Sequence, residues 1–405
     1  MNIKRKFFLV ILAIIVLGGL LVTGCTKGIA RGWAGGAVTP NGKMFVASMT
    51  GRIIAIDAST NAVLGTPAQL VTTASGGLSC LPSSCSGQSS AGVVIYASPE
   101  VSGQIVYVGG TDGKVYGYQF VDNSLLKDPE WVYPRQGTMS GYIIGGIVVA
   151  NDSVYFATSD GVVYALNANG LYLEWSKKID NKIWSAPIVD GDTLYIGSFG
   201  KTVYALNTTD GSEKWTYKTD GAISSTPVVD GNNIYIGDYD RYFYALDKAT
   251  GNLVWKFPPP NEVTDTPRNW FWAQPAVLNG VIYAPCLDGD VYALDAANGN
   301  LVNKYVLGNS ISSSPVVIGD SIVVATSVAS TDPKKQINNK VYIIDPTDKS
   351  RREVDLPDYE DVNAPLFNYG SIVYIHTSKD NLYWIDTAAQ DVKLSPNPIN
   401  LTTVK

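Results

Sequence analysis

The chain has 405 residues, of which 45% are hydrophobic and 16% charged, a composition that excludes a disordered chain. Glycine (39), proline (21) and tyrosine (24) are abundant and methionine (4) is scarce, which favours short strands joined by tight turns. The formal net charge is −6, and removal of the three basic residues at positions 4–6 makes it about −9, so no nucleic-acid partner is expected. A single histidine, His376, leaves little scope for histidine-based metal sites or triads.

The first 24 residues have the pattern of a secretory signal peptide. Positions 4–6 are basic, and residues 7–22 form an uncharged apolar run of 16 residues. The end of the run leads into Leu-Val-Thr-Gly-Cys at residues 21–25, which resembles the bacterial lipobox and implies a lipid on the Cys25 thiol. The alternative is an uncleaved transmembrane anchor, although 16 residues fall short of the roughly 20 that cross a bilayer core. Both interpretations place the rest of the chain outside the cytoplasm, and the first leaves residues 25–31 as a tether.

Three cysteines remain beyond Cys25. Cys80 and Cys85 are five positions apart in a loop-like stretch, where an oxidising compartment would permit a small disulfide-closed loop. The sequence leaves open whether the two are bonded. No thiol or histidine cluster accompanies the pair, so no metal site is expected there. Cys286 lies near the end of an apolar strand and is predicted to be a small buried residue.

A five-residue motif recurs along the chain, most clearly at residues 203–207, 243–247 and 291–295, which read Val/Phe-Tyr-Ala-Leu-Asn/Asp. Looser copies extend it to eight units with a mean spacing of 47 residues, a period that indicates a propeller or a solenoid. The last residues of the eight copies are Asp57, Gln119, Asn167, Asn207, Asp247, Asp295, Asp345 and Asp386.

Each unit divides into four short strands. In the fourth unit these are residues 185–189, 193–197, 202–206 and 213–217, and the turns between them include the Asp-Gly type that is typical of antiparallel hairpins. One four-stranded sheet cannot bury both of its faces, whereas eight sheets packed around an axis can. We therefore predict an all-β fold, an eight-bladed β-propeller of four-stranded antiparallel blades.

The predicted propeller covers residues 32–396, nearly all of the chain after the signal peptide. Residues 391–394 are expected to form the outer strand of the eighth blade. Residues 397–405 would then be a C-terminal tail.

The repeat resembles a known family. Residues 245–255 match Ala-x-Asp-x-x-Thr-Gly-x-x-x-Trp, the consensus of the pyrroloquinoline-quinone-type propeller repeat. In that family the tryptophan docks between neighbouring blades, which assigns Trp175, Trp215 and Trp255 to inter-blade packing. Four other units lack it, so weaker packing is expected at their seams; they carry Gly65, Asn303, Glu353 and Leu394 at this position.

The same resemblance includes quinoprotein dehydrogenases, which need calcium, a catalytic aspartate and commonly a vicinal disulfide. No two cysteines are adjacent in this chain, and the long insertions that build the quinone pocket are lacking. We therefore expect no enzyme activity and no cofactor. The shared repeat does not argue against this, because a fold is a poor guide to function. His376 is interpreted as a structural histidine, and a lone Asp238-x-Asp240 pair is weak support for calcium. The aspartates of three Asp-Gly pairs, Asp112, Asp160 and Asp288, recur at one place in the repeat and are interpreted as turn residues.

One face of the predicted propeller concentrates candidate binding features. Three insertions are expected on it, at residues 66–90, 258–269 and 329–339. Aligned inner strands also place three indoles near one mouth of the channel, with Ile144, Ser224, Ser312 and Val362 at this position in other units; the indoles are Trp33, Trp184 and Trp272. They form either an aromatic platform for a ligand or a plug of the channel. The adjacent cluster Arg268, Asn269, Trp270 and Phe271 has the composition of an interface.

The eight repeats, the lipobox and the scarcity of insertions resemble the lipoprotein subunit of the outer-membrane β-barrel assembly machinery, which binds the periplasmic domain of the barrel-forming subunit. The resemblance implies a non-catalytic, lipid-anchored, extracytoplasmic scaffold in envelope protein assembly, with an envelope or membrane protein as partner and Cys25 held in a lipid bilayer. The alternative is a cell-surface module for a glycan or peptide, and a third hypothesis is a quinoprotein-like oxidoreductase. The sequence leaves open whether the envelope has one membrane or two.

Overall fold

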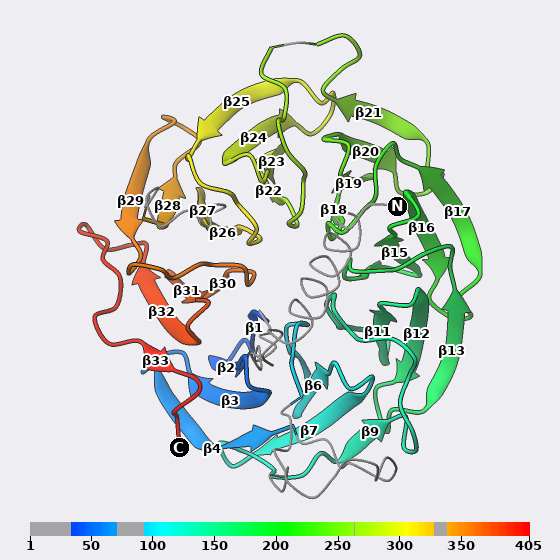
Figure 1. Ribbon diagram of the computed structural model, residues 1–405, viewed down its shortest axis with the longest axis vertical. Helices are drawn as coiled ribbons and strands as arrows, with labels where there is room; N and C mark the ends of the chain where they lie inside the picture. The colour runs from blue at the N-terminus through cyan, green and yellow to red at the C-terminus, as the bar shows by residue number, and fades with distance from the viewer. Residues whose placement is uncertain (1–33, 71–92, 263, 328–337) are drawn as a thin grey trace, which may run out of the picture. The chain divides into compact units, whose positions relative to one another are not determined.

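The computed structural model describes residues 34–70, 93–262, 264–327 and 338–405. All regular structure in these ranges is β-strand, and the strands form eight antiparallel sheets that follow one another around a central axis (Figure 1). Seven sheets have four strands and the second has five. The predicted eight-bladed β-propeller is therefore confirmed. Within the same ranges there is no helix long and apolar enough to cross a membrane.

The strands follow chain order from the inner to the outer edge of each blade. Blade 1 contains β1 (Gly36–Val38), β2 (Lys43–Ala47), β3 (Arg52–Asp57) and β4 (Ala62–Gln69). Blade 2 contains β5 (Glu100–Ser102), β6 (Ile105–Gly109), β7 (Val115–Val121), β8 (Ser124–Leu125) and β9 (Trp131–Tyr133). Blade 3 contains β10 (Val148–Ala150), β11 (Ser153–Thr158), β12 (Val162–Asn167) and β13 (Leu173–Lys178). Blade 4 contains β14 (Ile188–Asp190), β15 (Thr193–Gly197), β16 (Thr202–Asn207) and β17 (Glu213–Lys218).

The second half repeats this order. Blade 5 contains β18 (Val228–Asp230), β19 (Asn233–Gly237), β20 (Phe243–Asp247) and β21 (Leu253–Phe257). Blade 6 contains β22 (Ala276–Leu278), β23 (Val281–Pro285), β24 (Asp290–Asp295) and β25 (Leu301–Val306). Blade 7 contains β26 (Val316–Ile318), β27 (Ser321–Ala325), β28 (Lys340–Ile344) and β29 (Arg351–Asp355). Blade 8 contains β30 (Phe367–Tyr369), β31 (Ile372–His376), β32 (Asn381–Asp386) and β33 (Ile399–Asn400).

The core lies between the blades. The middle strands are buried along nearly their whole length, as in β15 and β16, because neighbouring blades cover both faces of each sheet. A representative cluster joins Tyr155 and Val163 of blade 3 to Leu194 and Ile196 of blade 4. Each inner strand contacts the inner strand of the next blade, and β1 contacts β30, so the ring is closed.

The three tryptophans of the family consensus lie in the seams between blades. The Nε1–H groups of Trp175, Trp215 and Trp255 donate to carbonyl oxygens of the following blade at 2.8, 3.0 and 2.9 Å. The acceptors are Thr208, Lys248 and Ala296. The prediction that these tryptophans serve inter-blade packing is confirmed.

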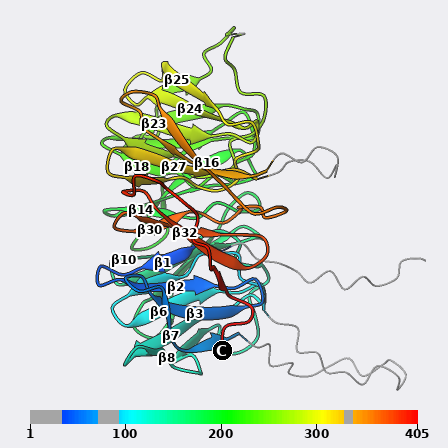
Figure 2. The same cartoon turned by 90° about the vertical axis from the view of Figure 1, so that its left-hand side faces the viewer.

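The C-terminal residues belong to the last blade. β33 pairs with β32, so the expected outer strand at 391–394 and the tail from 397 are both wrong. Val392 and Leu394 instead pack against the core between blades 7 and 8. In Figure 2 the C-terminal segment runs from β32 past β3 of blade 1.

Leu401 explains why the strand forms at the very end of the chain. Its side chain is fully buried in a cluster that includes Met44 and Ile54 of blade 1. The Arg52 guanidinium of blade 1 donates to the carbonyl oxygens of Leu401 and Thr402 at 3.1 and 2.7 Å. These contacts close the ring. They join residues about 350 positions apart, and local sequence patterns do not reveal contacts of such long range.

Candidate functional site

The site lies on the face that carries the turns between the second and third strands of each blade, which we call the top face. In an up-and-down blade, the connection from the outer strand to the next inner strand reaches the same face. The turn and this connection are hydrogen-bonded to each other in blades 2 to 8. In blades 4 and 5, for example, the Phe199 N–H donates to the Lys182 carbonyl at 2.9 Å, and the Tyr239 N–H to the Ala222 carbonyl at 2.9 Å. The top face therefore brings two kinds of loop from every blade side by side.

Five aromatic rings meet on the top face of blades 4, 5 and 6, and we call them the aromatic cluster. Trp184 lies edge-on to Phe199, with ring centroids 4.7 Å apart, and to Trp272 at 6.1 Å. Tyr239 contacts Phe199 at 5.6 Å and is stacked with Trp272 at 6.0 Å. Trp270 stacks on Tyr239 at 4.4 Å with only 7° between the ring planes. Offset and edge-to-face pairs of this kind stabilise one another and hold each ring in a defined orientation.

A small residue lets two predicted indoles meet. Trp184 and Trp272 come from blades 4 and 6, and the residue at their repeat position in blade 5 is Ser224. A serine leaves room over blade 5, and Tyr239 of the neighbouring turn contributes the ring that contacts Trp272. The prediction that the two indoles share one end of the propeller is therefore matched by direct contact between them.

The neighbouring interface-like residues divide into exposed and buried ones. Trp270 is 42% exposed, whereas Phe271 is 1% exposed and packs on Phe243 and Tyr292. The prediction that Phe271 belongs to a binding face is wrong, because successive residues point to opposite sides of an extended chain. The Asn269 side chain accepts a hydrogen bond from the Trp270 N–H at 2.9 Å, so it shapes the loop.

Arg268 extends over a buried carboxylate. Its guanidinium lies 3.5 Å from Asp290, whose side chain is almost fully buried and whose second oxygen, Oδ1, has no hydrogen-bond partner among the described residues. Burial, and then the nearby Asp288 carboxylate, raise the pKa of Asp290. Lys182, two residues before Trp184, and Arg241, two residues after Tyr239, are also exposed, as is Asp240 between Tyr239 and Arg241.

Several predicted features lie outside the described residues. These are Cys25, Trp33, the Cys80–Cys85 pair, most of the first and third insertions, and the N-terminal segment as a whole. Conversely, sequence reasoning missed Phe199 and Tyr239, which follow β15 and β19 by two residues. It also missed Tyr96, which lies four residues before β5, just as Trp184 lies four residues before β14. Counting back from the inner strand would have found Tyr96. The same count gives Asn363, and not the predicted Val362, as the equivalent residue of blade 8. Val362 is instead fully buried.

The structure gives His376 a structural role. Its side chain is 2% exposed, and its two ring nitrogens lie 2.8 Å from the Ala34 carbonyl and 2.9 Å from Asp380 Oδ1. Although burial opposes it, the hydrogen bonds from His376 and Thr402 hold the pKa of Asp380 below its usual value. His376 and Asp380 therefore form a buried hydrogen-bonded link at the seam between blades 8 and 1. This fits the interpretation of His376 as a structural histidine.

The acidic residues are likewise engaged in turns. Asp238 is fully buried and accepts hydrogen bonds from the Gly221 and Tyr242 N–H groups and the Tyr244 hydroxyl, at 2.7 to 2.9 Å. In the Asp-Gly turns, Gly113, Gly161 and Gly289 have φ of 69°, 90° and 92°, which fits the predicted turn role. Across the part of the chain that the structure describes, no group of three His, Cys, Asp or Glu residues could hold a metal ion.

Comparison with known proteins places this architecture. No curated protein sequence matches the chain. A crystal structure of BamB from Moraxella catarrhalis has a TM-score of 0.63 and 17% identity, covering 85% of this chain and 93% of that one. The computationally designed Ika8 protein has a TM-score of 0.64 and 14% identity, covering 86% and 94%. At these identities both show a shared propeller fold.

The family comparison is more specific. The family model described as outer membrane protein assembly factor BamB matches residues 24–170, 81–200, 134–218 and 159–394. Together these segments span most of the chain, including every blade. The chain therefore belongs to the BamB family of outer membrane protein assembly factors.

Proposed function

We propose that the protein is a non-catalytic scaffold that binds another envelope protein through the aromatic cluster. The observation that carries the proposal is the stack of Trp270 on Tyr239, which leaves Trp270 exposed beside Arg268. Tryptophan, tyrosine and arginine dominate binding hot spots. Because the rings already hold one another in place, little side-chain freedom remains to be lost on binding.

The family supports a partner in outer-membrane protein assembly. We take the partner to be the periplasmic domain of the barrel-forming subunit. Lys182, Arg241 and Arg268 flank the cluster, so the recognised surface should combine an apolar centre with acidic groups.

The lipobox-like sequence supports a lipid anchor on Cys25. Eight residues separate Cys25 from Trp33, a span of at most about 28 Å, so an acylated protein would be held close to its membrane. Mass spectrometry should find a diacylglycerol-bearing Cys25 at the mature N-terminus and no lipid in Cys25→Ser. An unmodified mature Cys25 would contradict the anchor.

The binding test compares two exposed aromatic residues. Trp270→Ala with Arg268→Ala should weaken binding of the purified periplasmic domain by about 10- to 100-fold, which is the usual cost of losing hot-spot residues. Tyr172→Ala is the matched control, since Tyr172 is 57% exposed but lies in the turn between the third and fourth strands, on the opposite face. It should bind normally. Equal affinities for the two variants would contradict the proposed face.

The non-catalytic part of the proposal has its own test. Titration with pyrroloquinoline quinone and calcium, followed by absorbance, should show no stoichiometric complex. Tight quinone binding with dye-linked oxidation of an alcohol or a sugar would overturn it.

A further inference from the structure

The seam between blades 6 and 7 lacks its tryptophan. Asn303 pairs with Ala293 of β24, as Trp255 pairs with Ala245 of β20, and both pairs stand beside the same shift in register. The Asn303 side chain is therefore at the place from which Trp255 enters the seam between blades 5 and 6. An asparagine is much smaller than an indole, so the space is not filled in the same way.

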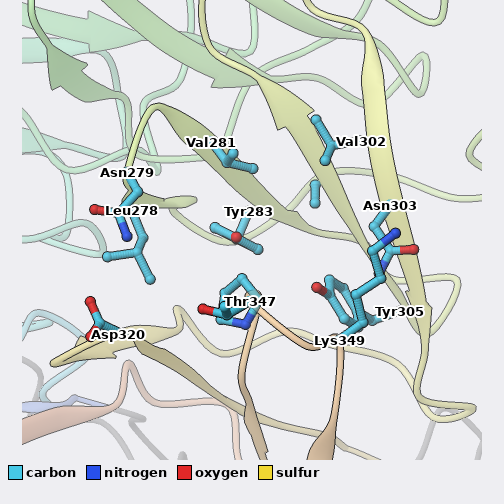
Figure 3. Close-up of a pocket in the computed structure, with 12 residues that line it drawn as sticks. Leu278, Asn279, Val281, Tyr283, Val302, Asn303, Tyr305, Asp320, Thr347 and Lys349 are labelled. Atoms are coloured by element: carbon cyan, nitrogen blue, oxygen red, sulfur yellow. The ribbon is translucent and has the colours of Figure 1, made fainter.

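A cavity of about 210 Å³ lies at this seam, and we call it the seam pocket (Figure 3). Its walls include the last strands of blade 6 and the turn between the last two strands of blade 7. The lining residues that matter here are Tyr283, Asn303, Tyr305, Asp320, Pro346 and Lys349.

The hydrogen bonds of this seam are also incomplete. In five other blades the tyrosine equivalent to Tyr283 donates its hydroxyl to a carbonyl oxygen of the next blade, at 2.8 to 3.3 Å. Those pairs are Tyr107–Ala168, Tyr155–Thr208, Tyr195–Lys248, Tyr235–Ala296 and Tyr374–Ala58. Tyr283 is 3% exposed and lines the pocket, yet its hydroxyl forms no hydrogen bond with any residue that the structure describes.

The expected acceptor is also unused. Pro346 is the blade 7 equivalent of Ala296, and its carbonyl oxygen receives no hydrogen bond from the described residues. At the next seam, between blades 7 and 8, the equivalent Thr387 carbonyl accepts from the Arg352 guanidinium at 2.9 Å. The seam pocket thus combines a cavity at the place of an indole with a tyrosine hydroxyl and a carbonyl oxygen that both lack a hydrogen-bond partner among the described residues. At the seam between blades 5 and 6, the equivalent Ala296 carbonyl accepts hydrogen bonds from both Tyr235 and Trp255.

We propose that the seam pocket binds an indole ring, supplied either by a small molecule or by a tryptophan side chain of a peptide. The Tyr283 and Tyr305 rings provide apolar contact. The Pro346 carbonyl oxygen and the Tyr283 hydroxyl oxygen are the two groups that can accept a hydrogen bond from the ring N–H. Three indoles already occupy equivalent seams of the same chain, so the chemistry of the walls is suited to this ring.

One wall differs from those seams. A Cβ on Gly299, whose φ is 75°, would lie 2.6 Å from the Trp255 ring, so the ring can take this position only beside a glycine. Lys349, with φ of 61°, takes that place in blade 7. The Lys349 Cβ narrows the pocket on this side, so a bound ring would lie closer to Tyr283 and Tyr305 than the position of Trp255 in its own seam would suggest.

Binding is tested with free indole and with N-acetyltryptophanamide, which carries peptide bonds on both sides of the residue. Calorimetry of the full chain should give a dissociation constant of about 0.1–1 mM for indole, as expected for a ligand of this size. NMR of tyrosine rings should show shifts at Tyr283 and Tyr305. Binding of both probes supports a peptide as the source, and binding of indole alone supports a small molecule.

Filling the pocket provides the decisive variant. Asn303→Trp combined with Lys349→Gly recreates the tryptophan–glycine pair and should raise the melting temperature and weaken indole binding at least tenfold. Lys349→Gly alone should retain binding, and so should Val306→Trp, which adds an indole to an exposed position of the same strand outside the pocket.

A milder variant covers the case in which the filled protein does not fold. Tyr283→Phe removes only the unpartnered hydroxyl and should weaken indole binding about three- to tenfold. No binding of either probe at 10 mM would overturn the proposal. Unchanged indole affinity in both the filled variant and Tyr283→Phe would overturn it as well.

Discussion

Closure of the ring by the C-terminal residues makes a quantitative prediction. Leu401 is fully buried between blades 8 and 1, although it is only four residues from the end of the chain. Its N–H donates to the Asp380 carbonyl at 2.8 Å, and the hydroxyl of Thr402 donates to the Asp380 carboxylate at 2.6 Å. Leu401→Ala should remove much of the apolar contact that holds this segment.

The magnitude follows from burial. Truncation of a fully buried leucine costs about 2–5 kcal/mol, and a terminal segment can partly collapse, so we expect about 3 kcal/mol. With a urea dependence of about 3 kcal/mol per molar, the unfolding midpoint should fall by about 1 M. Deletion of residues 398–405 should cost more, because the Arg52 hydrogen bonds and the pairing of β33 are lost as well.

Urea unfolding followed by tryptophan fluorescence measures the effect. The matched control is Leu253→Ala in β21. Leu253 is 45% exposed, so this substitution makes the same chemical change at the surface. The control should shift the free energy of unfolding by no more than about 0.5 kcal/mol. If Leu401→Ala and Leu253→Ala shift the midpoint equally, the C-terminal residues do not close the ring.

Three further predictions concern single positions. Burial raises the pKa of Glu100 to about 7, so its contribution to stability is fully present below pH 4.5 and is lost as the pH rises to about 7. Glu100→Gln should therefore add about 2 kcal/mol of stability at pH 8 and nothing at pH 4, and an equal gain at both would refute this. Gly299→Ala should lower the melting temperature more than Gly280→Ala, since the two have φ of 75° and 73° but only the first faces an indole; equal losses would deny that contact. His376→Ala should cost about 3 kcal/mol in urea unfolding, because a buried carboxylate loses one of its hydrogen-bond partners, and a loss below 1 kcal/mol would argue against the link.

The sequence predicts the blades well because each one repeats the same buried pattern. The Tyr-Ala-Leu stretches of β16, β20 and β24 occupy the third strand of consecutive blades, and their spacing therefore counts the blades. Counting fails where one blade departs from the period. Trp131 pairs with Gly117 as Trp175 pairs with Ala165, but the additional strand β8 delays it by four residues. A fixed offset of eight residues therefore misses it.

The candidate site is predicted less completely than the fold. Repeat alignment identifies Trp184 and Trp272, because inner strands begin at equivalent positions. It does not identify Phe199 and Tyr239, which belong to a different set of loops and meet the indoles only in three dimensions. Adjacency in sequence groups Phe271 with Arg268, Asn269 and Trp270, whereas the extended backbone turns its side chain into the core.

The proposed binding of the barrel-forming subunit takes place on the top face of blades 4 to 6. It is tested most directly by a photo-cross-linking residue placed at either end of blade 5 in living cells. Arg241 is exposed beside the aromatic cluster, and Asn232 is exposed in the turn at the opposite end of the blade. The account predicts cross-links to the barrel-forming subunit from position 241 and none from position 232. Cross-links from position 232 alone, or equal yields from both, would contradict it.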